Sequence, residues 1–278
     1  MKRVPFSVSR VGLIAQNSLR EAARQRLSGL LLVLALGLVA GAGWFRDFNF
    51  GAPELRFISD FGFGAMAFFG AVLAIAATAQ LFFSEIENRT ALTLLAKPVW
   101  RAEFIFGKFI AVVAVIGVFC ALLTVFLAVV LRWRETALMA EFPDAFRNGR
   151  VLHYDGLAVM GFLQALKLGV LVALTLLVAS FAQTQLYTVI MGFFVLVVCH
   201  LQYIAEEASV RSGSSVVRGL SGLMGLLFPN FQLFSLGDGL GEGGAVPWSR
   251  IARVTVYAAG YMVAAGVLAV LSFRKREI

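Results

Sequence analysis

Charged side chains are scarce in this chain. Asp, Glu, Lys and Arg make up 14% of its 278 residues, whereas hydrophobic residues make up 60%. A soluble domain carries roughly 25% charged residues. The mean hydropathy of +0.85 points the same way. The composition therefore excludes an ordinary soluble globular protein and indicates a membrane protein.

Histidine and cysteine are also few, which limits the kinds of reactive site that the chain can build. The histidines are His153 and His200, and the cysteines are Cys120 and Cys199, both inside apolar runs. Cys199 and His200 are adjacent, and adjacent residues of a helix point in different directions. The sequence contains neither H-E-x-x-H nor G-x-S-x-G. We therefore expect no catalytic residue, no metal site and no disulfide bond.

A nucleotide-binding P-loop is missing as well. The pattern G-x-x-x-x-G-K-[ST] would need a glycine in place of Ala102 and a Ser or Thr in place of Phe109, around Gly107 and Lys108. We therefore expect the chain to bind no nucleotide cofactor and to have no ATPase site of its own.

Long apolar runs make up most of the sequence. Six of them are long enough to cross roughly 30 Å of hydrocarbon: Ser28–Phe45, Phe61–Phe83, Phe109–Leu131, Leu157–Phe181, Leu186–Ile204 and Ile251–Phe273. A seventh run, Val216–Phe228, is too short to cross and predicts a re-entrant or interfacial helix. The expected fold is all-α: one transmembrane domain over residues 1–278, with a six-span bundle at residues 28–273 and a tail at residues 274–278.

The segment Phe6–Leu27, before the first run, is amphipathic at helical spacing. One face gathers apolar side chains and the other gathers polar ones: Val11, Ile14, Ala15, Ala22 and Leu27 against Arg10, Gln16, Arg20, Arg24 and Gln25. This pattern predicts that residues 1–27 hold an interfacial helix whose apolar face meets lipid and whose arginines lie near anionic head groups. The alternative is a basic flank of the first span, but a flank needs only a few residues.

Lysine and arginine are denser on one side of the expected membrane. The N-terminal segment, the Ser84–Lys108 segment and the C-terminal tail carry thirteen of them, whereas the other side carries ten on longer loops rich in Asp and Glu. Because basic residues favour the cytoplasmic side, we expect Ser84–Lys108 and both termini to be cytoplasmic. The basic residues lie beside apolar runs rather than on one polar face, so we expect no nucleic acid partner.

The Ser84–Lys108 segment also contains the signals of a short helix. Thr90 is suited to the N-cap, Ala91–Ala96 are good helix formers, and Pro98 ends the helix. A simple membrane anchor needs no such segment between two spans. The segment therefore predicts a surface to which a partner protein binds from the aqueous side, with Leu92, Leu94 and Leu95 available to that partner.

Lys167 is the one basic residue well inside an expected span. Gln164 precedes it by one helical turn, so both lie on one face. An ionised lysine at mid-bilayer costs about 2.5–3.5 kcal/mol on insertion scales. Two interpretations remain open: the pair lines a cavity for a polar or anionic substrate, or the ammonium reaches the membrane surface by snorkelling.

Four segments together resemble the permease subunit of a type 2 ABC exporter, in the subset whose ATPase is a separate polypeptide. They are AQNSLREAARQRL before the first span, EIENRTALTLLAKPVWRAEFIFGKF between the second and third spans, LFPNFQLFSLGD before the last span, and FRKRE after it. The second segment is the most specific, and the four occur in the order that the family shows.

The resemblance implies partners and a mechanism. Two such permeases pair, as a homodimer or a heterodimer, in the plasma membrane of a prokaryote, which is the inner membrane of a Gram-negative cell. Each docks an ATP-binding subunit on its cytoplasmic face, and that subunit uses ATP and Mg. The short helix between spans two and three would act as the coupling helix. The residues expected to carry the coupling are Glu85, Glu87, Arg89, Thr90, Leu92, Leu94, Leu95, Pro98 and Arg101.

Two further expectations accompany this interpretation. Glu85 and Arg89 are four residues apart and can pair on one helical face. Lys108, beside the membrane boundary, is expected to snorkel. The alternative function is a membrane scaffold or assembly factor without ATP-driven transport, which needs no ordered docking helix in the cytoplasm.

Overall fold

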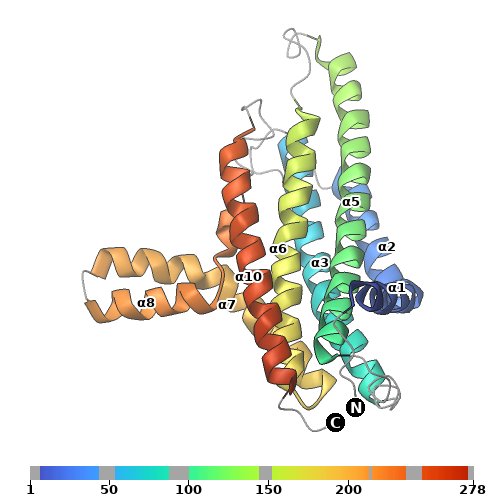
Figure 1. The fold of residues 1–278 in the computed structure, drawn as a ribbon. Coiled ribbons are helices and arrows are strands. Elements are labelled where there is room, and N and C mark those ends of the chain that lie inside the picture. The colour runs from blue at the N-terminus through green and yellow to red at the C-terminus, as the bar shows by residue number, and fades with distance from the viewer. Residues whose placement is uncertain are drawn as a thin grey trace.

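The computed structural model describes residues 7–43, 54–87, 100–143, 152–212, 215–235 and 246–274. In these ranges the regular structure is helical throughout, with no strand, so the expected all-α fold is confirmed. The centre is a bundle of four long helices, which lie side by side in Figure 1. These helices are α3 (Glu54–Glu87), α5 (Arg101–Glu141), α6 (Tyr154–Phe181) and α10 (Trp248–Arg274).

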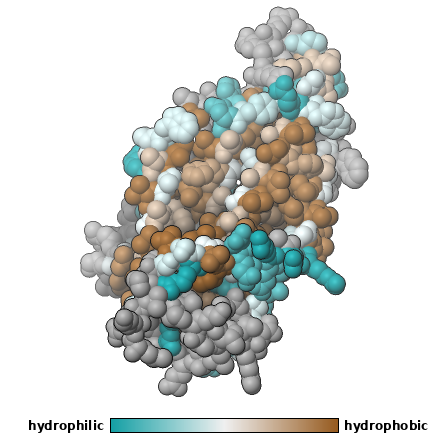
Figure 2. Space-filling view, turned by 45° about the vertical axis from the view of Figure 1, so that its right-hand side comes forward, coloured by the Kyte–Doolittle hydropathy of each residue, from teal (hydrophilic) through white to brown (hydrophobic). Residues whose placement is uncertain are grey.

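Shorter or more peripheral elements surround this bundle. They are α1 (Val8–Arg24), which packs on α5; α2 (Arg26–Gly41), which packs on α3; α7 (Gln185–Ser212), which packs on α6 and α3; α8 (Ser215–Leu227), which packs on α7; and the 3-10 helix η3 (Phe231–Phe234). In Figure 1, α1 lies beside the lower part of α5, and α8 projects sideways from the bundle. Figure 2 shows a broad hydrophobic band on one face, with hydrophilic groups above and below it.

Five helices of the described ranges are long and apolar enough to cross a membrane, namely Glu54–Ser84, Arg101–Glu141, Tyr154–Phe181, Gln185–Glu207 and Trp248–Phe273. A sixth span exists only if α1 and α2 count as one pair, bent by 64°. The first expected span, Ser28–Phe45, corresponds to α2, which has 16 residues and is about 24 Å long. Residues 44 and 45 lie outside the described part of the chain, and the extended backbone of Gln25 separates α2 from α1.

The other helices extend beyond the apolar runs that predicted them. Helix α5 has 41 residues and spans about 60 Å, although its apolar run covers only Phe109–Leu131. The polar residues that flank this run stay helical because they are paired. Glu103 contacts α1 near one end, and Glu135 contacts the residues that begin α6 near the other. Hydropathy alone therefore locates the middle of each span but not its ends.

Helix α6 is the most central helix. It contacts α3, α5, α7 and α10, and its residues from Val170 to Leu176 are all buried. Gly161 permits the close approach of α5, because a Cβ at that position would lie 2.2 Å from Thr124 Oγ1. The link from α6 to α7 is only residues 182–184, so the two helices form a tight hairpin.

Helix α8 has 13 residues and coincides with the short run Val216–Phe228. The chain after it is held against α10. The Tyr257 hydroxyl is 2.9 Å from the Asn230 backbone nitrogen and accepts its hydrogen bond, and the Tyr261 hydroxyl donates to the Gly225 carbonyl. These bonds place Phe231 and Phe234 of η3 in the interior of the bundle.

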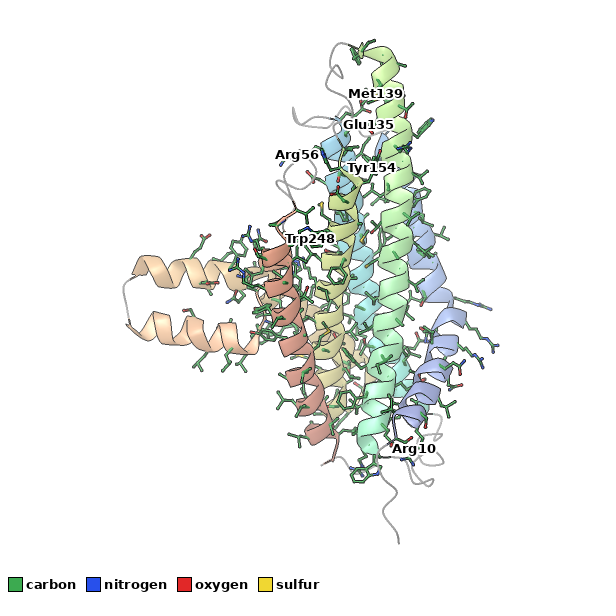
Figure 3. All side chains as sticks on the ribbon, turned by 45° about the horizontal axis from the view of Figure 1, so that its top comes forward. Arg10, Arg56, Glu135, Met139, Tyr154 and Trp248 are labelled. Carbon is green, nitrogen blue, oxygen red and sulfur yellow. The ribbon has the colours of Figure 1, made fainter. Side chains whose placement is uncertain are left out.

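At the end of the bundle away from α1, Glu135 holds the start of α6 (Figure 3). Its buried carboxylate accepts hydrogen bonds from the Leu152 backbone nitrogen at 3.2 Å and from the Tyr154 hydroxyl at 3.0 Å. On the same part of α5, Arg134 forms an ion pair with Glu54 of α3. These contacts join α3, α5 and α6 at this end.

We expect Glu135→Ala to lower the free energy of unfolding by about 1–3 kcal/mol, because two donors lose a buried charged acceptor. Tyr154→Phe removes only one of the two bonds and is expected to cost about 1 kcal/mol. Thermal unfolding of the full chain in detergent measures both effects. Equal melting temperatures for Glu135→Ala and the parent would show that these bonds contribute nothing.

Candidate functional site

Five helices meet at the end of the bundle where α1 lies, which we call the α1 end. A cluster of aromatic side chains joins the last turns of α3 and α10 to the first turn of α5. The ring centroids of Phe82 and Phe273 are 5.6 Å apart, and those of Phe104 and Phe273 are stacked at 5.7 Å. Ala179 and Ala182, at the end of α6, belong to the same cluster. The α1 end is therefore a packed joint between helices far apart in the sequence.

Glu103 is the polar centre of this joint. Its side chain is fully buried in the first turn of α5. Oε1 accepts hydrogen bonds from the Ser7 backbone nitrogen at 2.7 Å and from Arg10 Nη2 at 2.9 Å, and Oε2 accepts one from the Trp100 backbone nitrogen at 3.1 Å. A carboxylate is favourable at a helix N-terminus. One carboxylate thus caps α5 and fixes the start of α1 to it.

A second polar contact joins α1 to both α3 and α5. Lys108 Nζ is 4.0 Å from Glu21 Oε2, and Glu21 Oε1 accepts a hydrogen bond from the Ser84 hydroxyl at 2.9 Å. The Lys108 ammonium also lies 5.7 Å from the centre of the Phe104 ring. Because the Lys108 side chain is 1% exposed, the expectation that it snorkels is wrong: the nearby Glu21 carboxylate and the aromatic ring hold it inside.

Arg101 connects α5 to the end of α10. Its Nη1 donates to the Phe273 carbonyl at 3.0 Å, and its guanidinium lies 5.9 Å from the centre of the Phe273 ring. The last carbonyls of a helix have no partner within the helix, so a cationic donor there stabilises the end of α10.

The apolar face of α1 packs on the bundle, which corrects the expectation that it meets lipid. Val11, Ala15 and Ala22 are buried, and Ile14 approaches Gly107 of α5 so closely that a Cβ there would lie 2.6 Å from Ile14 Cγ2. Glycine at position 107 thus makes room for α1. The outer face of α1 instead exposes apolar side chains, including Leu13, which is 66% exposed.

A cavity of about 430 Å³ opens between α3, α6, α7 and η3. Its polar lining consists of Gln164, Lys167 and His200. Lys167 is 8% exposed, and its ammonium lies 5.5 Å from the centre of the Phe231 ring.

In the described ranges no group of three or more His, Cys, Asp or Glu side chains could hold a metal ion, and Cys120 and Cys199 are buried free thiols.

The comparison with known protein families decides what kind of protein carries this joint and this cavity. A family model described as ABC-2 family transporter protein matches residues 11–277. The chain belongs to the ABC-2 transporter family. No curated protein matches it at a significant level. As a member of this family it is a multi-pass membrane protein and the permease subunit of an ABC transporter, a class that works with an ABC ATP-binding subunit.

In this ABC-2 permease, the residues expected to couple to the ATPase fall into three groups. Glu85 and Glu87 belong to the last turn of α3, and Arg101 begins α5. The side chains of both glutamates lie outside the described part of the chain, as do the predicted short helix at residues 90–96 and the residues Arg89, Thr90, Leu92, Leu94, Leu95 and Pro98. The structure therefore describes the two helix ends that this segment joins, both of them at the α1 end.

Local sequence patterns did not predict the contacts that hold this permease together at the α1 end. Arg10 was expected on the polar face of an interfacial helix, and Glu103 and Glu21 were not expected to pair, because a single charge beside an apolar run resembles an ordinary flank. One local signal was available: an acidic residue three positions after the N-cap, here Trp100, is typical of the first turn of a helix. The two other partners of Glu103, Arg10 and Ser7, lie 93 and 96 residues away in the chain, which no local pattern reveals.

Proposed function

We propose that the chain is the permease of an ATP-driven exporter and that a separate ATP-binding subunit docks on its α1 end, in the cytoplasm. One observation carries this proposal. The polar segment between Glu87 and Trp100 joins the ends of α3 and α5, and the aromatic cluster couples those ends to α6 and α10. A force applied to the segment would therefore move four helices of the bundle together.

Helix α1 extends this coupling. Because Glu103 and Lys108 fix α1 to α5, a shift of α5 carries α1 with it. The outer face of α1 presents Arg20 and Arg24, both exposed, which suit either anionic lipid head groups or an acidic partner surface. In this arrangement residues 1–27 form the cytoplasmic amphipathic helix, residues 28–273 the bundle and residues 274–278 the cytoplasmic tail.

The leucines at positions 92, 94 and 95 supply the affinity for the ATP-binding subunit. Burying a leucine side chain contributes about 1.5–3 kcal/mol, from which the cost of association is subtracted. Glu85 and Arg89 orient the docking rather than dominate its affinity. ATP and Mg are bound by the partner, a second permease subunit completes the assembly, and the membrane is the plasma membrane of a prokaryote.

The orientation is tested with single cysteines on a background that lacks Cys120 and Cys199. Arg20→Cys places a thiol on the exposed face of α1, and His153→Cys places one at the opposite end, just before α6. In intact cells we expect a membrane-impermeant maleimide to label His153→Cys alone, and to label Arg20→Cys only after permeabilisation. Labelling of Arg20→Cys in intact cells would overturn the orientation.

A further inference from the structure

Lys167 lies near the middle of the bundle along its length. It is close to the midpoint of α6, and its neighbours contact the midpoints of two other helices. A Cβ at Gly70 of α3 would lie 2.5 Å from Leu168 Cδ1, and one at Gly169 would lie 3.5 Å from Met262 Sδ of α10. Both ends of α6 are about 20 Å from Lys167, which is much further than a lysine side chain reaches.

The Lys167 ammonium has no carboxylate partner within the described ranges. The ion pairs found there join other residues, and the contact seen for Lys167 is with the face of the Phe231 ring. One turn away, Gln164 Nε2 is buried and has no hydrogen-bond partner in the described structure. Both groups are hydrogen-bond donors that line the same cavity. Two buried donors without acceptors suit an anionic oxygen group.

His200 faces the same cavity but plays a different part. Its Nδ1 is 2.9 Å from the Leu196 carbonyl oxygen, which can only accept, so Nδ1 carries a proton. Its ring packs edge-to-face on Phe231, with the centroids 5.3 Å apart. His200 therefore fixes the position of the ring under the Lys167 ammonium.

The rest of the cavity wall is apolar and continuous with the outer surface of the bundle. Phe68 on α3 and Phe193, Val197 and Leu201 on α7 line it, and all four side chains are exposed at that surface. In a membrane protein such a surface at mid-depth meets hydrocarbon rather than water. A molecule that reaches Lys167 by this side must therefore carry a long apolar part.

We propose that this cavity binds an acidic lipid, with its carboxylate or phosphate on Lys167 and Gln164 and its acyl chain along Phe68, Phe193 and Val197. The two donors provide the charge complementarity, and the lateral apolar wall provides the route from the bilayer. Binding requires only this chain, so its success or failure is independent of the docking of an ATP-binding subunit.

The test uses the full chain in a neutral detergent with oleate as the probe. A diazirine analogue of oleate is cross-linked by light, and the labelled peptides are identified by mass spectrometry. We expect labelling of α3, α6 and α7 around the cavity, and displacement by oleate at a concentration roughly tenfold lower than by oleyl alcohol, because only oleate pairs with the ammonium. Acetate, which has the charge without the chain, is expected to displace nothing.

Three variants identify the residues responsible. Lys167→Met is expected to lower the affinity for oleate about tenfold without changing that for oleyl alcohol, and Lys167→Arg to retain most of the preference, since the charge persists. Ala165→Leu is the matched control, because Ala165 lies two residues away but lines a separate groove between α5 and α6. It is expected to bind oleate like the parent.

Several results would overturn the proposal. Equal displacement by oleyl alcohol and oleate would reduce the cavity to an apolar groove, and displacement by acetate would make the ligand a soluble anion. Unchanged oleate binding in Lys167→Met would remove the ammonium from the site. Native mass spectrometry of the same sample provides one more check: a dimer that carries no oleate at saturation would show that a second copy of the chain covers the cavity.

Discussion

Replacing Glu103 with alanine is expected to loosen α1 from α5 and to lower the free energy of unfolding by about 3–5 kcal/mol, the size typical of a broken buried ion pair. The substitution leaves Arg10 and the backbone nitrogens of Ser7 and Trp100 without their shared acceptor. Thermal unfolding of the full chain in detergent measures the loss. Trypsin cleavage after Arg20 and Arg24 is expected to become faster, because α1 separates from the bundle.

Gln16→Ala provides the matched control on α1. The Gln16 side chain is exposed on the outer face of the helix, so its loss is expected to change the free energy of unfolding by less than about 0.5 kcal/mol. A double-mutant cycle of Arg10→Ala and Glu103→Ala then isolates the direct pair, with an expected coupling of about 1–3 kcal/mol. If Glu103→Ala has the melting temperature of Gln16→Ala and resists trypsin like the parent, Glu103 does not hold the joint.

The long helices of the bundle were predictable because a helix that contacts lipid and the core along its length needs a long hydrophobic run in the sequence. The cores of α3, α5, α6, α7 and α10 lie where the runs place them, and the short run after residue 215 is the short helix α8. Composition alone indicated a membrane protein. The four segments that resemble an ABC permease also gave the family, which the match over residues 11–277 confirms.

Contacts between residues distant in the sequence were not predictable, and the wrong expectations for α1 and Lys108 follow from that. The apolar side of α1 looked suited to lipid, but Gly107 opens a place for Ile14 on α5. Lys108 looked suited to snorkelling, but Glu21 and Phe104 hold it inside. In each case the deciding partner is distant in the sequence, so its effect appears only after the helices have packed.

Changing Leu94 and Leu95 together to serine is expected to release the ATP-binding subunit. Two buried leucines contribute about 3–6 kcal/mol before association costs, and a loss of 1.4 kcal/mol already weakens binding about tenfold. We therefore expect at least a tenfold loss of the subunit in co-purification from detergent. ATP hydrolysis in proteoliposomes should no longer drive transport, while membrane insertion remains normal.

The adjacent leucines of α8 are the matched control for this double change. Leu226 and Leu227 are exposed on the helix that projects from the bundle, so changing both to serine removes the same amount of apolar surface elsewhere. This variant is expected to keep the ATP-binding subunit. If the Leu94 and Leu95 double variant also retains the subunit and transports like the parent, the docking surface lies elsewhere, most simply on α1 or the Ala182–Thr184 link.

Cross-linking between this permease and its co-expressed ATP-binding subunit shows at which end of the bundle that subunit docks. Thr93→Cys places a thiol in the segment that joins α3 to α5, and Trp248→Cys places one at the exposed start of α10, at the opposite end of the bundle (Figure 3). With a short bifunctional maleimide, we expect a cross-link to the ATP-binding subunit from position 93 and none from position 248. A cross-link from position 248 without one from position 93 would contradict it.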